Sequence, residues 1–211
     1  MKKRFLAGLM AAAVLTGIMT GCSKEQKEGI TTADGNTIII TLHPEVAPIT
    51  CENFEKLVNE KFYDGVVFHR VVDDFMAQGG DPTGTGSGGS AETIKGEFSA
   101  NSVDNTLSHQ RGVVSMARSM DMDSASSQFF ICYTDCSFLD GQYAAFGEVT
   151  EGMDVVDDFL KVGRVTNSMG EEASPITPIV MEEVTMIEDD ENGNPRVQIV
   201  MNDFLNEAQN N

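Results

Sequence analysis

Short apolar runs that end at glycine, proline or aspartate are the feature that most restricts how this chain can fold. Runs of about four to eight β-branched and aromatic residues between turn residues are typical of β-strands. The segments with this pattern are residues 36–42, 66–72, 74–78, 112–117, 128–133, 144–149 and 178–187. Because they do not alternate regularly with helical patterns, the sequence disfavours parallel βαβ winding and favours a closed β-barrel.

Two further stretches have the apolar spacing of α-helices. Between residues 49 and 62, apolar side chains recur at every third or fourth position, so they share one helical face. Residues 152–162 repeat this spacing with Met153, Val156 and Phe159. We therefore expect a mainly β fold in which helices cover the barrel.

The first residues have the pattern of a bacterial secretory signal. Basic residues 2–4 precede an apolar run, residues 5–19, that is shorter than the roughly 20 residues needed to span a bilayer. The junction from Met19 to Cys22 resembles the lipobox of bacterial lipoproteins, in which the cysteine thiol is diacylated and becomes the new N-terminus. A plain signal peptide with a coincidental cysteine is the alternative.

The lipobox pattern divides the start of the chain into two parts. Residues 1–21 are expected to be a lipoprotein signal peptide, and residues 22–35 a polar tether with the lipid on Cys22. Two or more acyl chains give a stable anchor. We therefore expect a bacterial lipoprotein that is held in the cell membrane by its lipid, with the folded part on the extracytoplasmic face.

The chain is strongly acidic, with 14 Lys and Arg against 33 Asp and Glu and a formal charge of −19. Nucleic-acid binding is excluded because no basic surface is available for phosphates. An anionic membrane surface would likewise repel the folded part. We expect residues 36–188 to form the folded domain, and the acidic, asparagine-rich residues 189–211 to form a solvated or loosely packed tail, in which a short strand or helix stays open.

Motifs for several other chemistries are missing. Glycine-rich residues 79–90 lack the lysine of a P-loop and are expected to form a surface loop. No GxSxG elbow of an α/β-hydrolase occurs, and the histidines lack metal-ligand spacing. Neither a metal nor a cofactor is expected. Cys51 and Cys132 are expected in the core, although a disulfide between Cys132 and Cys136 stays open for an oxidising compartment.

Several separated motifs resemble one enzyme family. They are FHRVVDDFMAQGGD (residues 68–81), GVVSMAR (112–118), SSQFFI (126–131) and FLDGQYAAFGEVTEGMDVVD (138–157). In this order they resemble the cyclophilin-type peptidyl-prolyl cis-trans isomerases, over about residues 36–187. The resemblance implies a closed eight-stranded antiparallel β-barrel capped by two α-helices, in agreement with the strand pattern. It also implies an enzyme that accelerates rotation about X-Pro bonds, here to assist the folding of exported proteins.

The same resemblance assigns a site. Arg70 is implied to be the catalytic residue. The implied lining of the proline pocket is Phe75, Met76, Phe130 and Leu139. The other implied substrate-binding residues are His69, Gln78, Ala117, Arg118, Gln128, Phe138 and Tyr143.

Three of these positions depart from the family pattern. Tyr143 stands where many members carry histidine, and Arg118 stands where others carry asparagine. Phe138 replaces a tryptophan of drug-sensitive members, so it keeps an apolar wall but lacks an indole N–H donor.

Rotation about a planar amide bond is slow because it has a barrier of about 18–20 kcal/mol. In the twisted transition state the nitrogen lone pair leaves resonance, so a donor aimed at it binds the transition state preferentially. An arginine stays protonated and has a rigid fork of donors. We expect a monomer that acts on proline-containing polypeptides. The alternatives are a proline-binding module without catalysis and an interaction protein that acts through its acidic tail.

Overall fold

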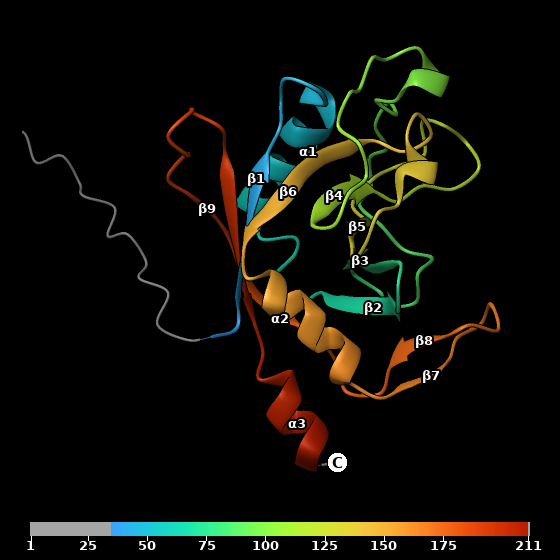
Figure 1. Ribbon diagram of the computed structural model, residues 1–211, viewed down its shortest axis with the longest axis vertical. Helices are drawn as coiled ribbons and strands as arrows, with labels where there is room; N and C mark the ends of the chain where they lie inside the picture. The colour runs from blue at the N-terminus through green and yellow to red at the C-terminus, as the bar shows by residue number, and fades with distance from the viewer. Residues whose placement is uncertain (1–34, 211) are drawn as a thin grey trace, which may run out of the picture.

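Eight strands form one curled sheet in the computed structural model, which describes residues 35–210 (Figure 1). In chain order they are β1 (Thr37–Leu42), β2 (Val67–Val72), β3 (Met76–Asp81), β4 (Val113–Met116), β5 (Phe129–Cys132), β6 (Ala145–Glu151), β9 (Met181–Ile187) and β10 (Arg196–Met201). They are hydrogen-bonded in the order β2-β3-β5-β4-β6-β1-β10-β9, and all neighbours are antiparallel. The expected mainly β fold is confirmed.

The remaining elements of the described residues are mostly helical. The α-helices are α1 (Pro48–Asn59), α2 (Met153–Asp158) and α3 (Phe204–Asn210). Short 3-10 turns are Ser99–Asn101, Ser137–Leu139 and Phe159–Lys161, of which the last continues α2. A separate hairpin consists of β7 (Arg164–Thr166) and β8 (Glu172–Pro175). Both helices expected from apolar spacing are therefore present, and α3 is a third.

Helix α1 starts where its sequence permits and where a distant side chain supports it. Pro48 opens the helix, a position at which its missing N–H group is not needed. The next two N–H groups, of Ile49 and Thr50, donate to the carboxylate of Glu97 at 3.1 and 2.8 Å. Glu97 is 2% exposed, so a buried carboxylate caps the helix that covers one end of the core.

The sheet is curled but not closed by a strand ladder. Its edge strands meet at an isolated bridge between Val67 and Val180. Two backbone hydrogen bonds flank this bridge, from the N–H of Phe68 to the carbonyl of Ile179 and from the N–H of Met181 to the carbonyl of Val66, both at 2.9 Å. On the side of this backbone that faces away from β2, the Asn202 side chain accepts from the N–H of Val180 at 2.8 Å and donates to the carbonyl of Pro178 at 3.1 Å. The expectation of a closed barrel is therefore overstated, and the fold is an eight-stranded half-barrel.

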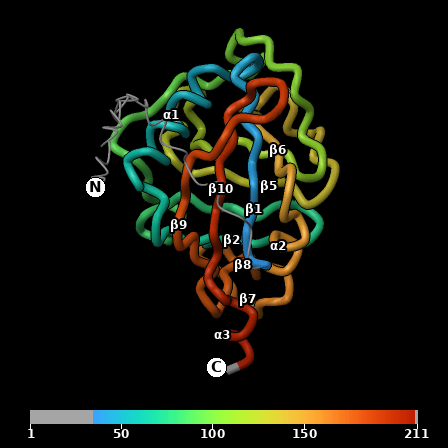
Figure 2. Tube along the Cα trace, turned by 90° about the vertical axis from the view of Figure 1, so that its left-hand side faces the viewer, coloured from blue at the N-terminus to red at the C-terminus, as the bar shows by residue number. Residues whose placement is uncertain are grey.

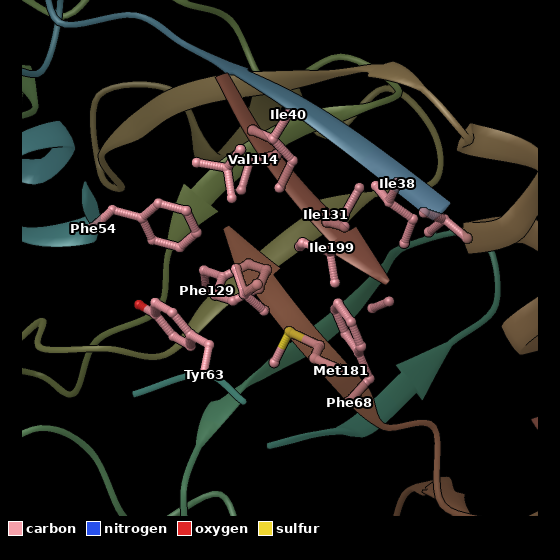
Figure 3. Close-up of a cluster of buried hydrophobic side chains, with 14 of the residues drawn as sticks. Ile38, Ile40, Phe54, Tyr63, Phe68, Val114, Phe129, Ile131, Met181 and Ile199 are labelled. Carbon is pink, nitrogen blue, oxygen red and sulfur yellow. The ribbon is translucent and has the colours of Figure 1, made fainter. Parts of the chain in front are cut away.

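The inner face of the sheet and α1 share one core (Figure 3). Phe54 of α1 lies edge-on to Phe129 of β5, with ring centroids 5.4 Å apart, and 5.1 Å from Phe146 of β6. Such aromatic pairs stabilise by about 0.5–1.5 kcal/mol beyond simple burial. Ile40 of β1 and Ile199 of β10 are fully buried in the same core, which therefore joins the first and the last strand.

The C-terminal residues belong to this fold. β10 lies between β1 and β9 (Figure 2), and Val197 is fully buried. Phe204 of α3 packs edge-on against Phe159, with ring centroids 5.3 Å apart. The expectation of a loosely packed tail over residues 189–211, outside a domain ending at 188, is therefore wrong. The apolar residues of β10 form one short run between segments rich in acidic residues and asparagine, so their burial depends on pairing with two strands.

Part of the sequence prediction lies outside the described residues. The expected signal peptide, the lipid-bearing Cys22 and the tether up to residue 34 belong to this part and stay predictions. Within residues 35–210, none of the helices has both the length and the apolar character needed to cross a membrane.

Replacing Ile199 by alanine is expected to lower the free energy of unfolding by about 2–5 kcal/mol, because it leaves a cavity between buried strands. Urea unfolding followed by circular dichroism measures this loss. Ile176→Ala is the matched control, since Ile176 is 61% exposed, and it should change stability by less than about 0.5 kcal/mol. Equal effects of the two substitutions would contradict the placement of β10 in the core.

Candidate active site

Strand pleating brings the expected site residues to one face of the sheet. Successive side chains of a strand point to opposite faces. Ala77 of β3 and Ile131 of β5 lie in the main core, so their neighbours Gln78 and Phe130 face the other way. The register places Arg70 of β2 opposite Gln78, and Gln78 opposite Phe130. Arg70 and Gln78 of one hairpin therefore lie beside Phe130, which is distant in sequence.

A pocket of about 340 Å³ lies on this face, within the range of about 300–1,000 Å³ that is usual for small-ligand pockets. The sequence-predicted residues that line it are His69, Arg70, Phe75, Met76, Gln78, Ala117, Arg118, Phe130, Leu139 and Tyr143. The structure adds residues from the loop after β3 and from the β7–β8 hairpin. They are Gly84, Thr85, Gly86, Asn167, Ser168, Met169 and Ser174.

The floor of the pocket is apolar. A small buried cluster, separate from the main core, consists of Met76, Phe130, Cys132, Cys136 and Leu139. Cys132 and Cys136 are free, buried thiols, and burial raises the pKa of both. The floor therefore offers apolar contacts to a ligand, and no charged side chain belongs to this cluster.

Two predicted residues lie beside this pocket instead of lining it. Phe138 is 64% exposed, and its ring centroid lies 5.8 Å from that of Phe75. Gln128 lines an adjoining pocket. Its Oε1 accepts from Gln78 Nε2 at 2.8 Å, and its Nε2 donates to the carbonyl of Gly88 at 2.7 Å. Gln128 thus links the groove to the glycine-rich loop.

Arg118 and Tyr143 form one wall together. The guanidinium of Arg118 donates to the carbonyl of Gln142 from Nε at 3.0 Å and from Nη2 at 2.8 Å. Its central carbon lies 4.7 Å from the centroid of the Tyr143 ring, which is a cation–π distance. The Arg118 side chain is therefore held by its own neighbours.

One carboxylate holds the glycine-rich loop in place. Asp81 is 1% exposed and accepts backbone hydrogen bonds at 2.7–3.1 Å from Thr83, Thr85, Gly86 and Gly88. Burial acts to raise the pKa of Asp81, but these donors, that of Gly88 foremost, lower it to about 2. The surface loop expected from the sequence is therefore fixed as a wall of the site.

A buried polar group that the sequence analysis missed lies behind Phe130. His109 is 1% exposed; its Nδ1 lies 2.7 Å from Asp140 Oδ1, and its Nε2 lies 2.9 Å from Ser115 Oγ. Its ring stacks on Phe130 with centroids 6.1 Å apart. Ser115 is fully buried, so this Ser-His-Asp arrangement has no access to a substrate and supports Phe130 instead.

Arg70 has partners on three sides. Its Nη1 lies 3.3 Å from Gln78 Oε1 and 3.6 Å from Met76 Sδ, and its guanidinium carbon lies 5.7 Å from the Phe75 ring centroid. Its Nε and Nη2 donate to the two oxygens of Glu171 at 2.6 and 2.9 Å. These hydrogen bonds lower the pKa of the Glu171 carboxyl, against the effect of burial. Glu171 lies in the β7–β8 turn, outside the motifs quoted above, so no sequence signal indicated it.

Comparisons with known proteins identify the family of this chain. The family model "Cyclophilin type peptidyl-prolyl cis-trans isomerase/CLD" matches residues 29–186. Peptidyl-prolyl cis-trans isomerase B of Bacillus subtilis (strain 168) is 48% identical over 121 residues, which are 57% of this chain and 81% of that protein. Peptidyl-prolyl cis-trans isomerase A of Dickeya dadantii (strain 3937) is 38% identical over 199 residues, covering 89% of this chain and 99% of that protein.

A solved structure has the same fold. The crystal structure of a Cryptosporidium parvum cyclophilin type peptidyl-prolyl cis-trans isomerase, in the presence of the dipeptide Ala-Pro, superposes with a TM-score of 0.62 at 28% identity. The match covers 70% of this chain and 93% of that chain.

The fold and the matches define an isomerase of peptide bonds. The chain belongs to the cyclophilin-type peptidyl-prolyl cis-trans isomerase family, and its activity is the cis-trans isomerisation of X-Pro bonds.

Stability is expected to fall as the pH drops below about 6.5, the ordinary pKa of histidine. Burial lowers the pKa of His69 and of His109 in the folded chain. The unfolded chain therefore binds more protons in this range, and acid favours unfolding. Their contribution is fully present above about 6.5 and is lost as the pH falls through the lower folded values.

Urea unfolding between pH 7.5 and 5 measures this decline. His69→Gln should make the decline shallower, because Gln has no proton to gain. An unchanged slope in His69→Gln would show that His69 does not contribute to it.

Proposed function

We propose that Arg70 catalyses the isomerisation by donating a hydrogen bond from Nη1 to the nitrogen of the X-Pro amide when that amide is twisted. The observation that carries this proposal is the position of Nη1, which is directed at Gln78 and Met76 beside the apolar floor. The planar amide offers no lone pair there, so the hydrogen bond forms only in the transition state. Each ~1.4 kcal/mol of such stabilisation accelerates rotation tenfold.

The substrate that fits the pocket is a proline-containing polypeptide segment. The pyrrolidine ring is placed on the floor formed by Met76, Phe130 and Leu139. Gln78 is placed to bind the substrate carbonyl, and Ala117 and Arg118 border the path of the substrate chain. The relative solved in the presence of Ala-Pro supports this class of substrate. Rotation then proceeds with the proline side held and the preceding residue turning.

The cellular role that best fits the sequence is assistance to the folding of exported proteins. The lipobox-like junction at Cys22 supports a lipid-anchored enzyme on the extracytoplasmic side of the cell membrane of a bacterium. The net charge of −19 supports a folded part that stays off an anionic membrane surface. Uncatalysed X-Pro isomerisation takes tens to hundreds of seconds, so clients that refold after export gain from such an enzyme.

Arg70→Ala is expected to lower kcat/KM about 10²–10³-fold on a proline-containing tetrapeptide, since removal of one aimed donor has this effect in other preorganised sites. A protease-coupled assay measures the rate. Arg70→Lys keeps the charge but loses the planar fork, so its kcat/KM should lie between those of Arg70→Ala and the unmodified protein. Arg111→Ala is the matched control, because Arg111 pairs with Asp157 outside the pocket. Equal rates for Arg70→Ala and the unmodified protein would remove Arg70 from the mechanism.

Metabolic labelling with a fatty acid in a bacterium that expresses the full chain tests the anchor. Cys22→Ser should abolish the label and release the protein from the membrane fraction, because the thiol is the acceptor. Ser23→Ala, a substitution at the adjacent residue, should keep both the fatty-acid label and the membrane association. Undiminished labelling of Cys22→Ser would refute the anchor and leave the isomerase assignment untouched.

A further inference from the structure

The Arg70 side chain presents two different edges to its surroundings. Its Nε and Nη2 lie on one edge and are both engaged by the Glu171 carboxylate, at 2.6 and 2.9 Å. Its Nη1 lies on the other and is directed at Gln78 and Met76, both of which line the pocket. The paired edge is therefore not the edge that faces the groove.

This ion pair is of the strong kind. The two parallel N–H···O bonds form a bidentate pair, which adds directional restraint to charge attraction. The side chains of Arg70 and Glu171 are only 20% and 32% exposed, so water competes less than at an open surface. A long arginine side chain that has no such partner samples several rotamers, whereas this pair selects one.

Glu171 is itself held by the turn that carries it. Asn167 donates from Nδ2 to Glu171 Oε2 at 3.3 Å, and its Oδ1 accepts from the Glu171 N–H at 3.0 Å. The backbone N–H of Asn167 donates to the carbonyl of Glu171 at 2.8 Å.

The hairpin that carries this turn is joined to the sheet near Arg70. Strand β8 packs beside β2, which carries Arg70 (Figure 1). In addition, Nη2 of Arg164 in β7 lies 3.6 Å from Oδ2 of Asp73, which follows β2 directly. The carboxylate is therefore presented to Arg70 by a built turn on an anchored hairpin.

Two effects of Glu171 on catalysis oppose each other. Its negative charge weakens the field of the guanidinium, whereas its two hydrogen bonds fix the direction of Nη1. Hydrogen bonds weaken steeply with misalignment, and at a partly exposed site the effective dielectric constant of about 20 damps the charge effect. Direction is therefore the larger effect, because the amide nitrogen accepts from one side only.

We propose that Glu171 is a positioning residue of this isomerase: it holds the Nε–Nη2 edge of Arg70, so that Nη1 stays aimed at the amide nitrogen of the rotating bond. This inference rests on the catalytic role proposed for Arg70. It makes the β7–β8 hairpin a part of the active site, although no sequence motif of the groove lies on it.

The test compares kcat and KM on a proline-containing tetrapeptide for the full chain and its variants. Glu171→Ala should lower kcat about tenfold and change KM less than about twofold, since the substrate itself does not touch Glu171. Glu171→Gln keeps one hydrogen-bond acceptor and should recover part of the loss. Glu172→Ala is the matched control: it removes the same charge from the same hairpin at an exposed position, and its kcat should not change.

A double-mutant cycle separates this inference from the role of Arg70. If Glu171 acts through Arg70, the double variant Arg70→Ala/Glu171→Ala should be no slower than Arg70→Ala alone. Full activity of Arg70→Ala would contradict both proposals. A lowered kcat in Arg70→Ala together with full activity of Glu171→Ala would contradict the positioning role only. A raised kcat in Glu171→Ala would show inhibition by Glu171, and a raised KM alone would show substrate contact; each overturns the proposal.

A spectroscopic measurement distinguishes the restraint on Arg70 from a general loss of structure. The Nε–H proton of Arg70 in the ¹⁵N-labelled protein should resonate downfield and exchange slowly with water, because it donates to a carboxylate. Glu171→Ala should shift this signal upfield and speed its exchange, while thermal unfolding stays within the range of Glu172→Ala. An unchanged Nε–H signal would contradict the proposed restraint.

Discussion

The period-two alternation of the strands is the constraint on which the rest of the structure depends. In β3 and β5 it sends Ala77 and Ile131 into the main core and turns Gln78 and Phe130 to the opposite face. The antiparallel register then brings Arg70 beside Gln78. A shift by one residue would exchange the two faces, so the aromatic core and the groove are specified by the same pairing.

Carboxylates that accept several hydrogen bonds organise the surroundings of the groove. Asp81 gathers the backbone donors of the glycine-rich loop. Asp140 holds His109, whose ring supports Phe130. Glu171 holds Arg70. Each carboxylate is stable in its surroundings because donors surround it, and in each case the group that it fixes borders the site. Several acidic residues of this chain therefore fix groups beside the site by hydrogen bonds, in addition to contributing to the net charge.

Local patterns predicted most of the elements. Strands β1 to β6 and β9 and the helices α1 and α2 were expected, because alternation and 3.6-residue spacing are properties of short segments. The half-barrel was not expected, because only the curvature of the folded sheet decides that its two edge strands meet at a single bridge, from Val67 to Val180. The position of β10 was not expected either. Its six residues have acidic neighbours in the sequence, and they form a strand inside the sheet only when β1 and β9 pair with them.

The amino-acid sequence by itself determined the family and most of the side chains on the strands of the groove, since its motifs are contiguous; the lining from the glycine-rich loop and the β7–β8 hairpin was decided by the structure. The sequence also carries the whole case for the signal peptide and Cys22. The tertiary structure alone decided that Glu171 meets Arg70, 101 positions away in the chain, and that His109 supports Phe130. Hydrogen bonds between distant segments depend on where the sheet's curvature brings them, and no local pattern encodes that distance.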